Sequence, residues 1–182
     1  MSKSRIYIIL VFISMILFIS SNSFRLKFDL TNNKLYSLKK NNKEIIKNID
    51  KPLMIKIYLS GNLPSDFRYL KEYVNNFVFE LSKSNKLINY EFINLDAMMS
   101  TGKDVLKYLT SKNLLPTEID IVGKNEQTKK VIYPGAIVLY DGKESSFNFL
   151  QSNVFKSNEQ NINNSIQNFE FEFFKCLDNL MK

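Results

Sequence analysis

The sequence contains no histidine and no tryptophan, and it contains a single cysteine among its 182 residues. The missing histidine removes the usual general base, the usual partner of a nucleophile and the commonest transition-metal ligand. Cys176 has no second cysteine for an internal disulfide, and its neighbours Phe173, Phe174 and Leu177 favour a buried thiol over a reactive one. Catalysis by carboxylates or lysine remains possible, but no pair of such residues stands out. We therefore expect a protein that is not an enzyme and that holds no cofactor and no metal.

Arginine is also scarce, occurring only at positions 5, 25 and 68, although the formal net charge is +7. Arginine is the residue that base and phosphate recognition favours. The lysines that supply most of the positive charge are scattered, and no run of Lys and Arg is longer than two. This pattern predicts a solvated surface and no nucleic-acid partner.

One long uncharged stretch is present, at the N-terminus. Residues 6–19 are apolar except for Ser14, and the uncharged run continues to Phe24. Its length of about 19 residues is close to the ~20 that a helix needs to cross a bilayer. We expect a transmembrane signal anchor over residues 6–24, with a cytoplasmic tip at residues 1–5 and the rest of a single-pass inner-membrane protein in the periplasm.

A cleaved signal peptide is the alternative interpretation of the same stretch. Its apolar core is short enough, and Ser21-Asn22-Ser23 resembles a cleavage site with small residues. The intact mass of the mature protein would separate an anchored form from a secreted one.

The part after the anchor, about 155 residues, has the size of one compact domain. A short juxtamembrane strand and helix are predicted over residues 25–51. From residue 52 the hydrophobic periodicity predicts the order β-α-β-α-β-β-α, with Asp141-Gly142 as the turn of a hairpin. This is the order of the thioredoxin fold, so we expect an α/β, thioredoxin-like extracytoplasmic domain at residues 52–182. The loop after its first strand contains no cysteine, so the C-x-x-C motif is absent.

One strand is predicted over residues 131–140, and it continues past Tyr133-Pro134 and Gly135 into residues 136–140. Thioredoxin-like proteins place a cis-proline at this point, which makes Pro134 a candidate cis-proline. An ordinary trans proline at the start of a strand fits the same pattern.

Several segments, taken in order, resemble the N-terminal part of GldG, the gliding-motility-associated auxiliary subunit of an ABC transporter in Bacteroidota. The matching segments are Arg25-x-Lys27-x-Asp29-Leu30-Thr31-x-x-Lys34-x-Tyr36-Ser37-Leu38, Asp50-x-Pro52-Leu53-x-Ile55-Lys56-x-Tyr58-Leu59, Leu63-Pro64-x-x-Phe67, Tyr90-Glu91-Phe92-Ile93-Asn94, Pro134-Gly135-Ala136 and Asn163-Asn164-Ser165-Ile166-Gln167-Asn168-Phe169-Glu170-Phe171-Glu172. The resemblance covers essentially the whole chain. GldG-type proteins continue through a second extracytoplasmic domain to a C-terminal membrane helix, so we expect a shortened member, a split gene product or a fragment.

The resemblance implies an auxiliary component of an ABC-type transport or gliding-motility system that is held at the membrane and works by binding protein. Its implied partners are an ABC permease and ATPase, or a separately encoded remaining half of the subunit. Two sets of residues are candidates for the interaction surface. One lies just after the anchor and comprises Asp29, Leu30, Thr31, Tyr36 and Leu38. These side chains either meet a permease or pack the first helix onto the domain.

The second set is Phe171 and Phe174, which lie off the main apolar stripe of the C-terminal helix. They either meet a partner or are covered by the domain's own sheet. Two other functions stay open: a stand-alone binding domain, secreted or anchored, with no transporter, and a degenerate thiol-oxidoreductase. The latter needs a reactive thiol near Pro134, whereas Cys176 is in a different element.

Overall fold

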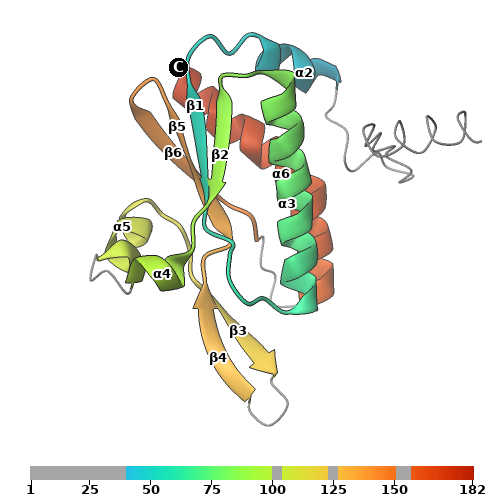
Figure 1. Ribbon diagram of the computed structural model, residues 1–182. Coiled ribbons are helices and arrows are strands. Elements are labelled where there is room, and N and C mark those ends of the chain that lie inside the picture. Colours follow the sequence, from blue (N-terminus) through green and yellow to red (C-terminus); the bar gives the residue numbers. More distant parts are fainter. Residues whose placement is uncertain (1–39, 100–103, 123–126, 151–156) are drawn as a thin grey trace, which may run out of the picture. The chain divides into compact units, whose positions relative to one another are not determined.

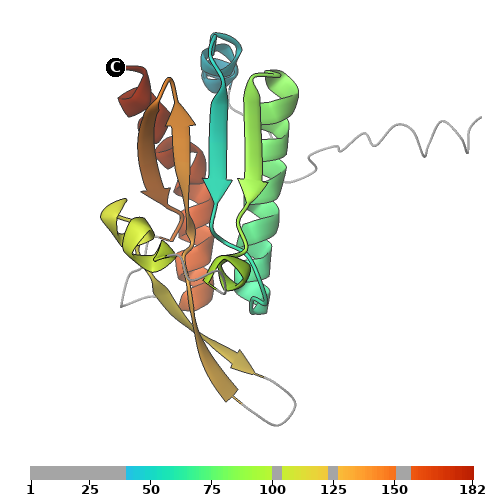
Figure 2. The same ribbon diagram turned by 60° about the vertical axis from the view of Figure 1, so that its left-hand side comes forward.

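The computed structural model describes residues 40–99, 104–122, 127–150 and 157–182 (Figures 1 and 2). The chain separates into a unit of residues 1–34 and a compact unit of residues 35–182, and the described residues all belong to the second. In chain order the elements are α2 (Lys40–Lys47), β1 (Leu53–Ile57), α3 (Ser65–Ser84), β2 (Ile88–Phe92), α4 (Leu95–Met99), α5 (Val105–Ser111), β3 (Thr117–Val122), β4 (Gln127–Ile132), β5 (Gly135–Tyr140), β6 (Lys143–Asn148) and α6 (Asn158–Met181).

Four of the strands form a mixed sheet in the order β2-β1-β5-β6. β1 runs parallel to β2 and antiparallel to β5, and β5 pairs with β6 in a hairpin. The two residues of its turn, Asp141 and Gly142, have φ of 51° and 75°. Positive φ at both positions gives the tight turn that suits the right-handed twist of a hairpin, which confirms the predicted Asp-Gly turn.

Two long helices, α3 and α6, cover one face of this sheet and lie side by side (Figures 1 and 2). The apolar residues of α3 repeat at helical spacing in the sequence, and all six are buried: Phe67, Leu70, Val74, Phe77, Val78 and Leu81. Aromatic rings fill the space between the helices and the sheet: Phe77 and Phe173 lie 5.2 Å apart, and Phe147 of β6 lies 5.4 Å from Phe169. Edge-to-face pairs of this kind add to the stability that burial itself provides.

The short helices α4 and α5 pack on the opposite face of the sheet (Figure 1). They build a second, smaller core from the following buried residues: Tyr58, Leu95, Val105, Leu109, Leu114, Tyr133 and Ile137. Both faces of the sheet therefore contribute to the hydrophobic interior.

Asn85, in the loop between α3 and β2, attaches α2 to this layered structure. Its side-chain amide donates to the carbonyl oxygens of Ile46 at 2.9 Å and Ile49 at 2.8 Å, while its own oxygen accepts from the Leu87 amide at 2.9 Å. The last carbonyls of a helix have no partner within the helix, so one side chain satisfies groups that α2 leaves open.

β3 and β4 pair only with each other, in a two-stranded sheet separate from the first (Figures 1 and 2). The buried Ile119 and Ile132 join this ribbon to the main core. The Lys130 ammonium forms an ion pair with Asp96 of α4 at 2.6 Å. The same ammonium lies close to Gly61, since a Cβ atom on that glycine would be 3.2 Å from it. The ribbon is thus fixed at the end of the sheet where β1 and β2 finish.

The predicted fold class, a membrane helix followed by a thioredoxin-like domain with the order β-α-β-α-β-β-α, is wrong. Among the described residues, no helix has the length and apolar character that a membrane span requires. A second helix, α4, and the separate β3–β4 sheet stand between β2 and β5, so the observed order is different. The error has a physical source: residues 131–140 read as one continuous strand, whereas the chain leaves one sheet at Ile132 and enters the other at Gly135. The predicted tip at residues 1–5 and anchor at residues 6–24 lie outside the described residues.

Candidate functional site

The structure describes only part of the predicted interaction surface. Asp29, Leu30, Thr31, Tyr36 and Leu38 lie outside the described residues, so their role stays a prediction. Phe171, Phe174 and Pro134 are described.

The candidate cis-proline is wrong, because the described residues contain no cis peptide bond and Pro134 is therefore trans. The proline is buried and connects the ribbon to β5, and its carbonyl accepts from the Phe149 amide at 2.7 Å. Gly135 follows it in a tight space, since a Cβ there would lie 2.5 Å from Cδ2 of Leu114. Pro134-Gly135 thus marks a crowded crossing between the two sheets.

Phe171 and Phe174 differ in their surroundings. Phe171 points away from the core and is 63% exposed, whereas Phe174 is half-buried, packs against the main core and lies 5.3 Å from Phe173. The domain therefore covers Phe174 but leaves Phe171 open among the described residues. An exposed phenylalanine on a helix surface is an apolar group that a partner could cover.

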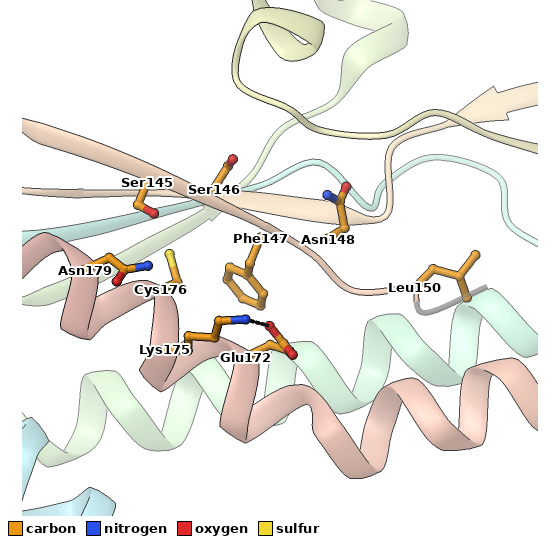
Figure 3. Close-up of a pocket in the computed structure, with 9 residues that line it drawn as sticks. All are labelled: Ser145, Ser146, Phe147, Asn148, Leu150, Glu172, Lys175, Cys176 and Asn179. Atoms are coloured by element: carbon orange, nitrogen blue, oxygen red, sulfur yellow. Dashed lines mark ion pairs between the residues drawn. The ribbon is translucent and has the colours of Figure 1, made fainter. Parts of the chain in front are cut away.

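A cavity of about 330 Å³ opens between β6 and the second half of α6 (Figure 3). Phe171 lies outside its lining, four residues before the lining residue Lys175 on the same helix. Residues 145–148 of β6 line one side, and Glu172, Lys175, Cys176 and Asn179 line the other. β6 is the last strand of the main sheet, so the cavity lies along a strand edge with which no other described strand pairs. Such an edge presents backbone donors and acceptors to another extended chain.

Some polar groups that line the cavity form hydrogen bonds within the domain, whereas others can reach an incoming ligand. Asn148 holds the neighbouring loop through the Leu115 amide at 2.8 Å and the Asn113 carbonyl at 3.0 Å, and Ser146 donates to the Lys112 carbonyl. Lys175 makes a loose ion pair with Glu172 at 3.7 Å and is 61% exposed. Lys175 and the exposed Asn179 can therefore reach an incoming polar chain, so the arrangement suits recognition by hydrogen bonds.

Cys176 lies at the inner wall of this cavity and is buried, as the sequence predicted. Burial raises the pKa of its thiol, although a hydrogen bond with Ser145 opposes that change. A thiol with a raised pKa is mostly protonated near neutral pH, and the thiolate is the nucleophile. This geometry weighs against thiol chemistry at Cys176.

Lys112 and Glu144 bring a second group of polar residues together on the opposite face of the sheet, where they form an ion pair at 2.5 Å. Tyr58 is buried nearby, directly after β1. Its burial raises its pKa to about 12, and the charges of Tyr108, Glu144 and Glu91 act in the same direction. Loss of the proton would place a charged oxygen in the small core, so we assign Tyr58 a packing role.

This environment predicts a stability loss at high pH that depends on Tyr58. The folded pKa is about 12 against an ordinary value of 10.0, so the contribution of Tyr58 is complete below pH 10.0 and is lost as pH rises toward 12. Tyr58→Phe should therefore lose less stability than the wild type between about pH 8 and about pH 11, as measured by urea unfolding at each pH. The exposed Tyr69→Phe is the control. If the free energy of unfolding falls equally with pH in the wild type and in Tyr58→Phe, Tyr58 does not cause the stability loss at high pH.

No group of three or more His, Cys, Asp or Glu side chains in the described parts of the chain is placed to hold a metal ion. Sequence reasoning found Phe171 but missed the cavity beside it. The missed signal was the polar composition of residues 143–148, which is typical of a strand at a sheet edge.

Comparison with known proteins gives one match. Residues 32–139 match a family described as a domain of unknown function, DUF7088. No curated protein matches the chain, and no solved structure matches it. The matched region runs from before α2 through most of β5, and it ends before β6 and α6, which form the cavity. Since the match covers more than half of the sequence, this chain belongs to the DUF7088 family.

Proposed function

We propose that this chain is a membrane-anchored extracytoplasmic component of an ABC-type transport or gliding-motility system, and that it works by binding another protein. The surface proposed to bind is the edge of β6 together with the outer side of α6, named here the β6–α6 surface. It comprises the cavity beside Cys176 and the exposed ring of Phe171.

The observation that carries the binding role is the edge of β6, which pairs with no further strand among the described residues, together with the exposed Phe171 on the helix that lines the same cavity. An extended segment that adds to a sheet edge gains main-chain hydrogen bonds, and adjacent pockets for its side chains give specificity. The cavity can take one such side chain, with Lys175 and Asn179 as polar contacts. Phe171 supplies the apolar contact, which is the kind of aromatic group that commonly dominates binding energy.

The location and the transport system rest on other support. The uncharged stretch at residues 6–24 supports the anchor and the periplasmic placement. The resemblance to GldG supports the transport or gliding system and a permease, an ATPase or a separately encoded remaining half as the partner. The second candidate is a stand-alone binding domain, which the same β6–α6 surface serves equally well.

Copurification from native membranes tests this proposal. We expect the tagged protein, extracted in mild detergent, to bring down an ABC permease and its ATPase. Phe171→Glu should reduce that recovery about tenfold or more, since a charge at the centre of an apolar contact removes a dominant interaction. Phe79→Glu is the matched control: Phe79 is 44% exposed on α3, which does not line the cavity.

Two results would count against parts of the proposal. If the wild type extracts alone, the transporter assignment fails and the stand-alone domain becomes the better interpretation. If Phe171→Glu and Phe79→Glu reduce the recovery equally, the partner does not bind at the β6–α6 surface.

A further inference from the structure

Lysines that are scattered in the sequence gather at one end of the folded domain. β1, β2 and β6 begin side by side, because Leu53 pairs with both Ile88 and Tyr140, and Tyr140 pairs with Lys143. This places at one sheet end the lysines that precede or open these strands, which are Lys51, Lys86 and Lys143.

α2 adds further lysines to the same end. The Asn85 side chain binds the carbonyls of Ile46 and Ile49, which holds the end of α2 against the loop after α3. That contact places α2, which carries Lys43 and Lys47, against the end of α3, which carries Lys83. The basic end, as we name it, therefore comprises six exposed lysines: Lys43, Lys47, Lys51, Lys83, Lys86 and Lys143.

The carboxylates at the basic end do not balance these lysines. Three are present in the same segments, Glu44, Asp50 and Asp141, which leaves a formal net charge of +3. Asp141 pairs with Lys51 at 2.6 Å, and Asp50 accepts a hydrogen bond from the Tyr140 hydroxyl at 2.9 Å.

Most of the formal net charge of +7 lies before the described residues: residues 1–39 carry +5, and residues 40–182 carry +2. The lysines of the basic end are therefore a local excess on a nearly neutral domain.

We infer that the basic end contacts a membrane surface that carries anionic lipid headgroups. The inference rests on the membrane location in the proposed function. Lysine is a flexible point charge suited to a diffuse layer of phosphates, and the described lysines here build no pocket for a single ligand. Each lysine near an anionic bilayer strengthens binding about fivefold. Ile45, which lies between Lys43 and Lys47 and is 40% exposed, adds an apolar contact at the same place.

The chain length outside the described residues is compatible with this contact. Fifteen residues, 25–39, separate the predicted anchor from α2. They span at most about 50 Å, so an anchored domain stays close to the surface, where even weak attraction suffices to orient it.

A headgroup-quenching experiment on the full chain tests the inference. A fluorophore is attached at Ile45→Cys in a Cys176→Ala background, and the protein is reconstituted in vesicles with a quencher on the lipid headgroups. One set of vesicles is phosphatidylcholine, and the other contains phosphatidylglycerol as well. We expect quenching several-fold stronger in the anionic vesicles, and weaker again at high salt because screening removes the attraction. A fluorophore at Asp120→Cys, on the ribbon, should show no such difference.

Charge reversal supplies the matched comparison. Lys43→Glu with Lys47→Glu should abolish the extra quenching at position 45, whereas Lys107→Glu with Lys129→Glu, which changes the net charge equally, should leave it intact. Equal quenching in the two kinds of vesicle, or equal loss in both double variants, would overturn the inference. Flotation of the vesicles at high salt measures whether the protein stays inserted through its anchor. Loss of insertion is thereby distinguished from loss of the contact between the basic end and the lipid headgroups.

Discussion

Phe173→Ala should destabilise the domain by about 3–5 kcal/mol, the cost of removing a large buried ring from a packed core. Phe173 has no exposed surface, and its ring lies 5.2 Å from Phe77, 5.9 Å from Phe147 and 5.3 Å from Phe174. The substitution therefore leaves a cavity where both long helices meet the sheet. Urea unfolding followed by circular dichroism measures the free energy of unfolding.

Phe171→Ala is the matched control, because it removes the same ring from the same helix at a site that is 63% exposed. Its stability should stay within about 0.5 kcal/mol of the wild type, as is usual for surface changes. The pair separates two roles on α6: Phe173 supports the fold, and Phe171 is available for a partner. A large stability loss in Phe171→Ala would mean that Phe171 is covered, which would remove it from the β6–α6 surface.

Asn85→Ala should cost about 1–2 kcal/mol, because a hydrogen bond contributes roughly 1 kcal/mol, and it should loosen α2. The variant loses the donor to the part-buried carbonyls of Ile46 and Ile49, whereas the exposed Leu87 amide can bond to water instead. Thermal unfolding gives the stability change, and hydrogen exchange should show faster exchange of α2 amides specifically.

Asn89→Ala, an exposed asparagine on β2, is the control for this substitution. It should leave both the stability and the protection of α2 close to those of the wild type. Unchanged protection of α2 in Asn85→Ala would show that α2 is held by its apolar contacts through Ile46 and Ile49 instead. Because α2 carries Lys43 and Lys47, a loosened α2 should also weaken the contact of the basic end with anionic vesicles.

Features that depend on near neighbours in the chain follow from the amino-acid sequence alone. The six apolar positions of α3 repeat at helical spacing, so its buried side follows from local geometry. Asp141-Gly142 tolerates positive φ, so the hairpin turn follows from two residues. The apolar neighbours of Cys176 correctly indicated a buried thiol.

The way in which distant segments combine depends instead on tertiary contacts. Residues 117–122 and 127–132 pair with each other rather than with the main sheet, and the buried Ile119 and Ile132 join this ribbon to the main core. The dependence on tertiary contacts also explains the wrong fold class and the missed cavity. The strand at the edge of a sheet can be identified only when the strand order is known. It also explains the basic end: its lysines are scattered along the sequence, and they meet because three strands begin together and Asn85 binds α2.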